Sequence, residues 1–98
     1  MSMPGGASGT KAADEEIQKL CDAIRDDLEK KAGRKFTDYT AKEYKSQVVA
    51  GTNYFVKIDV GNGQAIHARI YQPLPGQGEL TLNNYKADLK LEEELAYF

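Results

Sequence analysis

Cys21 and His67 are the two residues of this chain best suited to nucleophilic catalysis. A catalytic cysteine needs a nearby base, and His67 is the only histidine in the sequence. Cys21, however, lies at helical spacing with Ile17, Ile24 and Leu28, which predicts a small core residue. One histidine cannot build a metal site either, so we expect His67 on the polar face of a strand. We therefore predict that the chain is not an enzyme and has no catalytic residue, no metal site and no cofactor.

The stretch Gln47-Val48-Val49-Ala50-Gly51 indicates binding rather than catalysis. It separates two strand-like runs, where a turn normally carries Asn, Asp, Gly or Pro. Here a turn would carry two valines and an alanine, with Gly51 free to adopt a positive φ. Exposed apolar side chains at a hairpin tip are typical of a binding surface. The alternative is one long buried strand without a turn, and these residues alone leave both interpretations open.

A second apolar group occurs in the segment 73–78, Pro73-Leu74-Pro75-Gly76-Gln77-Gly78. Its composition predicts a loop exposed to water. Leu74 lies between two prolines, so an apolar side chain would be held in solvent on a restricted backbone. Such restriction lowers the cost of ordering the loop when it binds a partner.

Charge and length exclude several classes of function. The chain has 13 Lys and Arg against 15 Asp and Glu, a net charge of -2 that argues against nucleic-acid binding. No run approaches the roughly 18 apolar residues of a transmembrane helix, so we expect no membrane association. The N-terminus lacks the basic start and apolar core of a secretory signal, and one cysteine cannot form an intrachain disulfide. These features predict a cytoplasmic protein with a single domain over 1–98.

One helix is predicted at 14–32, after a flexible leader at 1–11. Asp14 suits the N-cap, and Gly33 suits the left-handed position after the last turn. The apolar stripe of this helix consists of Ile17, Leu20, Cys21, Ile24 and Leu28.

Four strands are predicted at 35–49, 52–60, 65–72 and 79–91, with a further short strand as an option within 7–13. Gly61-Asn62-Gly63 is a strong turn signal, and irregular spacing between Tyr39 and Tyr44 indicates a bulge. In the last strand Leu80, Leu82 and Asn84 should share one face. We expect Tyr97-Phe98 to pack on the sheet near the helix or to contact a partner. The element order predicts an α+β domain in which an antiparallel β-sheet with one dry face covers a single N-terminal α-helix.

Four stretches resemble segments of the cystatin superfamily. Gln47 to Gly51, continued by Thr52-Asn53-Tyr54, resembles its first inhibitory hairpin, Gln-x-Val-x-Gly. Three further stretches resemble the N-terminal trunk, the second hairpin and the C-terminus, and they are Met3-Pro4-Gly5-Gly6, Gln72-Pro73-Leu74-Pro75-Gly76 and Glu94-Leu95-Ala96-Tyr97-Phe98. Without insertions or paired cysteines, the chain is most similar to the type 1 cystatins, or stefins. That resemblance implies a sheet wrapped around the helix.

The resemblance also implies a function: reversible, competitive, non-covalent inhibition of papain-like cysteine proteases such as cathepsins. The trunk would turn away before the catalytic cysteine, so no peptide bond would be presented for cleavage. The active form would be a monomer, and straightening of the first hairpin would allow a domain-swapped dimer. The protease-binding residues would be Met3, Pro4, Gly5 and Gly6 of the trunk, Gln47, Val48, Val49, Ala50 and Gly51 of the first hairpin, and Leu74 and Pro75 of the second.

Fold does not determine function, so a second interpretation is kept. In it, the chain is an interaction or scaffold domain that retains the cystatin fold without inhibiting proteases.

Overall fold

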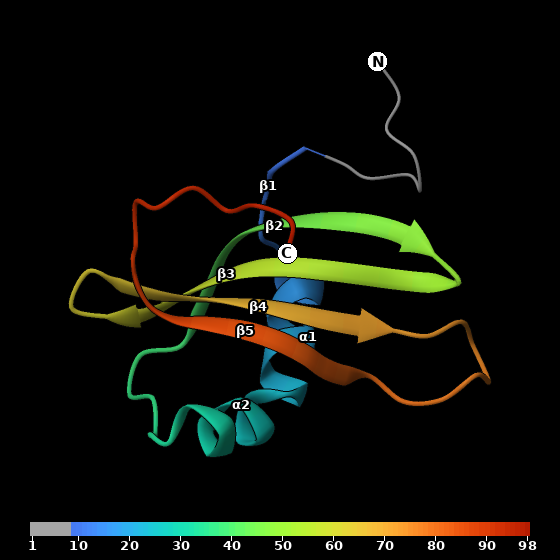
Figure 1. The fold of residues 1–98 in the computed structure, drawn as a ribbon, viewed down its shortest axis with the longest axis horizontal. Coiled ribbons are helices and arrows are strands. Elements are labelled where there is room, and N and C mark those ends of the chain that lie inside the picture. The colour runs from blue at the N-terminus through green and yellow to red at the C-terminus, as the bar shows by residue number, and fades with distance from the viewer. Residues whose placement is uncertain (1–8) are drawn as a thin grey trace.

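A five-stranded antiparallel sheet with helices on one face forms the structure, a computed structural model that describes residues 9–98 (Figure 1). The strands lie in the order β1-β2-β3-β4-β5, so each pairs with its neighbour in sequence. The strands are β1 (Lys11–Ala12), β2 (Thr40–Val49), β3 (Gly51–Gly61), β4 (Gln64–Gln72) and β5 (Thr81–Lys90), and the helices are α1 (Glu15–Ala23) and α2 (Arg25–Ala32). This arrangement confirms the α+β class and the optional short strand.

The helical segment begins and ends where the sequence predicts. The Asp14 side chain accepts a hydrogen bond from the Ile17 amide at 3.0 Å, which satisfies a free donor of the first turn. At the other end Gly33 adopts φ 74°, and its amide donates to the Glu29 carbonyl at 2.9 Å.

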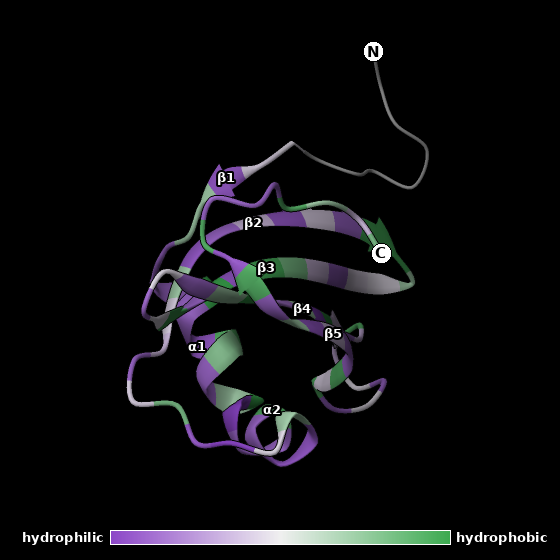
Figure 2. Cartoon of the chain, turned by 60° about the vertical axis from the view of Figure 1, so that its left-hand side comes forward, coloured by the Kyte–Doolittle hydropathy of each residue, from purple (hydrophilic) through white to green (hydrophobic). Residues whose placement is uncertain are grey.

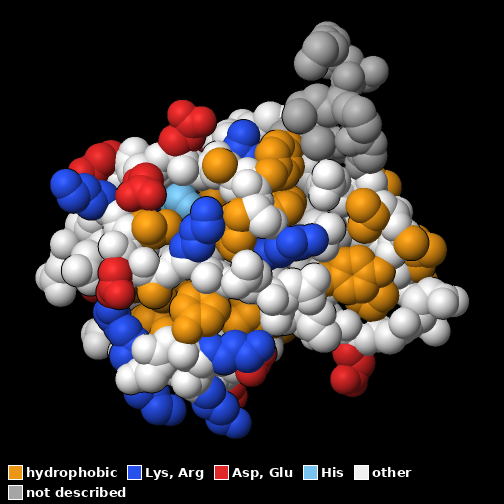
Figure 3. All heavy atoms as spheres, in the orientation of Figure 1, with side chains coloured by type: hydrophobic (Ala, Val, Ile, Leu, Met, Phe, Trp, Pro, Cys, Tyr) orange, Lys and Arg blue, Asp and Glu red, His pale blue; other side chains and the backbone are white. Residues whose placement is uncertain are grey.

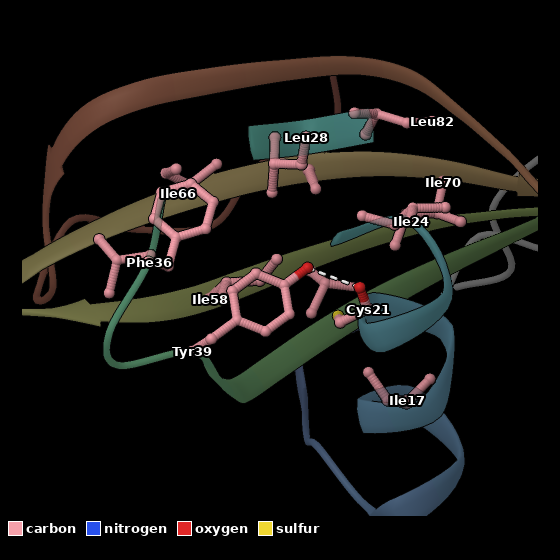
Figure 4. Packing of buried hydrophobic residues seen from close by; sticks show 13 residues of the cluster. Ile17, Cys21, Ile24, Leu28, Phe36, Tyr39, Ile58, Ile66, Ile70 and Leu82 are labelled. Carbon is pink, nitrogen blue, oxygen red and sulfur yellow. Dashed lines mark hydrogen bonds between the residues drawn. The ribbon is translucent and has the colours of Figure 1, made fainter. Parts of the chain in front are cut away.

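The predicted single helix is corrected by a break at Ile24, where φ is -102° and ψ is 6°. Figures 1 and 2 show α2 turned away from the axis of α1. No glycine or proline causes the break, so the sequence carried no signal for it. In an unbroken helix the Cys21 carbonyl pairs with the Arg25 amide. Here that carbonyl accepts a hydrogen bond from the Tyr39 hydroxyl at 2.6 Å, a contact from outside the helix (Figure 4).

The core lies between the helices and the sheet (Figure 4). The apolar stripe continues through the helix break, because Ile17, Cys21, Ile24 and Leu28 are all buried. They pack against side chains of β3, β4 and β5, which include Val56, Ile58, Ile66, Ala68, Ile70 and Leu82. Cys21 is fully buried, which confirms its prediction as a core residue.

The strand predicted at 35–49 begins later, at Thr40. Phe36 and Tyr39 belong to the preceding loop, although both are buried and their rings stack with centroids 5.6 Å apart. The predicted bulge is confirmed by a register shift between Ala41 and Glu43.

The last strand differs from its predicted alternation. Its register against β4 shifts, so that Leu82 pairs with Ile70 but Asn84 pairs with Arg69. Leu80 precedes the strand, and Tyr85 rather than Asn84 packs against the core. The cause is an irregularity in β4–β5 pairing that strict two-residue periodicity does not anticipate.

The C-terminal segment covers the face of the sheet opposite the helices (Figure 1). Phe55 is 2% exposed and lies edge-on to Tyr97 and Phe98, at centroid distances of 5.0 and 5.7 Å. Leu95 is buried as well. The prediction that Tyr97-Phe98 packs on the sheet is confirmed, but its placement near the helix was wrong. Two expectations change with it: both faces of the sheet are covered, and His67 is buried rather than on an open polar face.

Candidate functional site

The stretch from Gln47 to Gly51 forms a hairpin turn, which rejects the interpretation of one long strand. Val49 pairs with Gly51 across Ala50, and Val48 pairs with Thr52. The two valine side chains extend from the end of β2, which Figure 2 colours as hydrophobic. Val48 is 56% exposed and Val49 is 46% exposed. The tip therefore presents apolar surface to solvent, as the turn interpretation requires.

Gly51 is required at the tip by its conformation and its surroundings. Its φ of 106° is one that residues with side chains rarely adopt. A Cβ atom at this position would lie 2.5 Å from the Gln72 carbonyl oxygen and 2.8 Å from the Tyr71 hydroxyl. The Tyr71 hydroxyl donates a hydrogen bond to the Ala50 carbonyl. The tip is thus held close against the end of β4.

The second loop connects β4 to β5 and also exposes an apolar side chain. Leu74 is 52% exposed, between Pro73 and Pro75. The Gln77 amide donates to the Leu74 carbonyl at 2.9 Å, which closes a turn in the loop. Gly76 supplies a positive φ of 79° within it.

Pairing of β3 with β4 brings the two loops to the same end of the sheet (Figure 1). Thr52 pairs with Gln72, so the residues that follow the first tip lie beside those that precede the second loop. A hollow of about 450 Å³ lies between the loops, bordered by Gly51, Leu74 and Leu80 among others. Figure 3 shows hydrophobic side chains uncovered at this end of the molecule.

We name this end the apolar edge and define it by Val48, Val49, Ala50, Gly51, Leu74 and Pro75. Within residues 9–98, the exposed large hydrophobic side chains are Val48, Val49 and Leu74, and all three belong to it. Residues drawn from two separate loops are thus concentrated in one place. Such concentration is characteristic of a binding surface rather than of chance exposure.

Gln47 lies at the base of the same hairpin, where it pairs with Asn53. The structure therefore brings seven of the predicted site residues together. The other four, Met3, Pro4, Gly5 and Gly6, lie outside the described residues.

The apolar edge carries no ionisable side chain, so its contribution is contact and shape. The two candidates for reactive chemistry lie elsewhere, in the interior. Burial, with a smaller effect of Asp22, raises the pKa of the Cys21 thiol to about 12, so the thiolate is scarce at neutral pH. Residues 9–98 contain no group of His, Cys, Asp or Glu side chains able to hold a metal ion. Neither helix in this range has the length and apolar character needed to span a lipid bilayer.

Tyr71 is the residue of this site that sequence reasoning missed. Alternation in β4 places it on the outward face beside His67 and Arg69. Its relation to Ala50, however, depends on the pairing of two strands and cannot be read from spacing within one. Its position one residue before the Gln72-Pro73 segment was the available signal.

The sequence is similar to those of known proteins along nearly its full length. The sequence matches the Cystatin domain over residues 5–92. It is 45% identical over 97 residues to Cystatin-B of Oplegnathus fasciatus, covering 98% of this chain and 97% of that protein. It is 44% identical over 97 residues to Cystatin-B of Homo sapiens, and the match covers 98% of this chain and 99% of that protein. Cystatin-A of Mus musculus is 38% identical over 96 residues, and the match covers 98% of this chain and 99% of that protein.

An antiparallel sheet with helices on one face and two apolar loops at one end is the cystatin architecture, and the chain belongs to the cystatin family. Its relatives place it in the type 1 group, the stefins, as the four sequence stretches predicted. Membership confirms the prediction of an inhibitor rather than an enzyme, and it implies cysteine proteases as partners.

Proposed function

We propose that the chain is a reversible, competitive and non-covalent inhibitor of papain-like cysteine proteases of the cathepsin type. In this proposal the apolar edge enters the active-site cleft and blocks access of substrate. The observation that carries it is the gathering of Val48, Val49 and Leu74 at one end of the sheet. No residue of the inhibitor takes part in a reaction, in keeping with the uncharged character of the edge.

The apolar edge can supply a large part of the binding free energy. Complete burial of a Val or Leu side chain contributes about 1.5–3 kcal/mol. Three such residues would contribute several kcal/mol toward the roughly 12 kcal/mol of a nanomolar complex. Because Pro73 and Pro75 restrict the second loop, little ordering is needed there on binding.

The N-terminal trunk is the third element of the proposed site. Met3, Pro4 and Gly5 would lie along the non-primed side of the cleft, and Gly6 follows them in the trunk. The trunk would turn away before the catalytic cysteine of the protease, which explains inhibition without cleavage. Gly5 is the proposed functional glycine, because a residue without Cβ allows the backbone to approach the cleft wall.

Titration of papain activity tests the proposal. The parent chain should inhibit competitively and reversibly, and Val49→Asp should weaken inhibition because it places a charge on a surface that becomes buried. A variant that begins at Ala7 should also bind more weakly. Asn62→Asp is the matched control, because it adds the same charge to the exposed turn between β3 and β4, at the opposite end of the sheet.

Two outcomes contradict the proposal. Absence of inhibition by a folded monomer would favour the scaffold interpretation. Equal loss of inhibition in Asn62→Asp and Val49→Asp would show that charge, rather than the apolar edge, governs the effect.

We also propose a monomeric active form in the cytoplasm. Support for a reducing compartment comes from the free, buried Cys21, the only cysteine in the chain. Fractionation of cells that express the chain would test the cytoplasmic location, and recovery of the protein chiefly from the secreted fraction would contradict that location.

A further inference from the structure

We propose that Tyr71 is a positioning residue that holds the tip of the first hairpin in the conformation required for protease binding. This inference rests on the proposed function, which assigns binding to Val48 and Val49. It assigns to Tyr71 no contact with the protease. Its role is to connect the turn at Ala50 to strand β4.

The position of Tyr71 makes this connection possible. It lies near the end of β4, where it pairs with Asn53 of β3 and Thr81 of β5. Its backbone is therefore held by strands on both sides. Its hydroxyl donates to the carbonyl of Ala50, the residue between the last residue of β2 and the first of β3. The bond reaches the turn residue that the β2–β3 register leaves without a partner.

Gly51 shows how closely the phenol and the tip approach each other. A Cβ atom on Gly51 would lie 2.8 Å from the Tyr71 hydroxyl, closer than such contacts occur in proteins. The glycine is thus adapted to the tyrosine as well as to its own φ of 106°. The backbone oxygen of Gln72, 2.5 Å from the same Cβ position, places the tip against β4 as well.

Holding the tip matters because it carries exposed apolar residues. Val48 and Val49 are half exposed, so packing against the rest of the chain does little to order them. A tip that is ordered before binding avoids the entropic cost of becoming ordered in the complex. One hydrogen bond of ordinary net strength corresponds to about a three- to tenfold change in the inhibition constant.

Tyr71→Phe removes the hydroxyl and retains the ring. The matched control is Tyr85→Phe on the neighbouring strand β5. The Tyr85 hydroxyl also donates to a backbone carbonyl, that of Lys31 at 2.7 Å, but on helix α2. Each variant therefore loses one phenol-to-carbonyl bond, and only one of the two bonds reaches the apolar edge.

The test combines papain inhibition with amide hydrogen exchange and urea unfolding. We expect Tyr71→Phe to weaken inhibition about three- to tenfold and to accelerate exchange at the Ala50 and Gly51 amides. Tyr85→Phe should change neither, and both variants should keep similar urea midpoints. A purely structural role for Tyr71 would lower the urea midpoint without this selective effect on the tip.

Parental inhibition and parental tip exchange in Tyr71→Phe would overturn the inference. If the parent chain itself fails to inhibit papain, the proposed function fails, and tip exchange then decides the role of Tyr71. Faster exchange in Tyr71→Phe alone would show that the tyrosine holds the tip, and unchanged exchange would overturn that as well.

Discussion

Lys57 and His67 lie directly opposite each other on β3 and β4, and both are buried on the face of the sheet away from the helices. The row extends outward on both sides, since Glu43 pairs with Lys57 and Lys86 pairs with His67. The Lys57 ammonium lies 2.9 Å from the Glu43 carboxylate. The His67 Nε2 atom is buried without a hydrogen-bond partner among residues 9–98. His67 thus lies between Lys57 on β3 and Lys86 on β5.

The stability of the chain should fall as the pH decreases below about 6.5, the ordinary pKa of histidine. Burial, followed by the charge of Lys57, lowers the pKa of His67 in the folded state, and Lys86 adds to this while Glu93 and Glu43 oppose it. The unfolded chain then binds a proton more readily than the folded chain. His67 consequently contributes its full stability above pH 6.5 and loses it as the pH falls through the lower folded pKa. Urea unfolding between pH 7.5 and about 5 measures the effect.

Replacement of His67 by Gln should flatten that pH dependence, because no titrating group remains at the position. As His67 is the only histidine in the sequence, its ring signals in an NMR titration report the folded pKa directly. A measured pKa at or above 6.5 would contradict the prediction.

Gly51→Ala should destabilise the fold by roughly 2–4 kcal/mol and weaken protease inhibition as well. Part of the cost comes from φ 106°, and the rest comes from the collision with Gln72 and Tyr71. Gly63→Ala separates the two contributions, since Gly63 has φ 72° but open space around it. We expect Gly63→Ala to lower the free energy of unfolding by only about 1–2 kcal/mol. Equal losses of stability in thermal or urea unfolding would show that the collision with Gln72 and Tyr71 adds nothing to the cost of the positive φ.

Leu95→Ala should cost about 2–5 kcal/mol of folding free energy, because Leu95 in the C-terminal segment is only 1% exposed. Leu74→Ala is the same substitution at an exposed site and should change stability by less than about 0.5 kcal/mol. Urea unfolding compares the two. If Leu95→Ala proves as mild as Leu74→Ala, the C-terminal segment does not pack on the sheet in solution.

Leu74→Ala should instead weaken papain inhibition by about 1–2 kcal/mol, or roughly five- to thirtyfold. The reason is that Leu74 is exposed in the free chain and would become buried in the complex. The inhibition constant measures this, and an unchanged value would remove the second loop from the proposed site.

Heating should convert part of the chain into a domain-swapped dimer through opening of the first hairpin. Val48 and Val49 stand exposed at a tight turn, and straightening of this turn would join β2 and β3 into one long strand that can pair with a second copy. Size-exclusion chromatography after heating should reveal a dimer that does not inhibit papain, with a larger dimer fraction for Tyr71→Phe than for Tyr85→Phe. Elution of the heated chain only as a monomer would contradict this hypothesis.

Local features of the chain were predictable because short-range physics governs them. Asp14 and Gly33 delimit the helical segment, since the free donors and acceptors of a helix end require such residues wherever the helix lies. The turn at Gly61-Asn62-Gly63 and the bulge before Tyr44 follow from the same kind of local constraint. The apolar edge was predictable only in part: valine in a turn conflicts with local preference, so residues 47–51 alone left a hairpin turn and one long buried strand both open.

Other features depend on contacts between residues distant in sequence. The break at Ile24 accompanies a hydrogen bond from the Tyr39 hydroxyl to the Cys21 carbonyl. The spacing of apolar residues within the helix cannot predict such a contact. The burial of Phe55 on the outer face of the sheet depends on a C-terminal segment whose Tyr97 and Phe98 rings pack edge-on against it. The contact of Tyr71 with Ala50 requires β4 to lie beside β3 in one particular register. Periodicity reports which face a residue occupies, but the residue that lies opposite is set by the pairing of strands and the packing of segments over them.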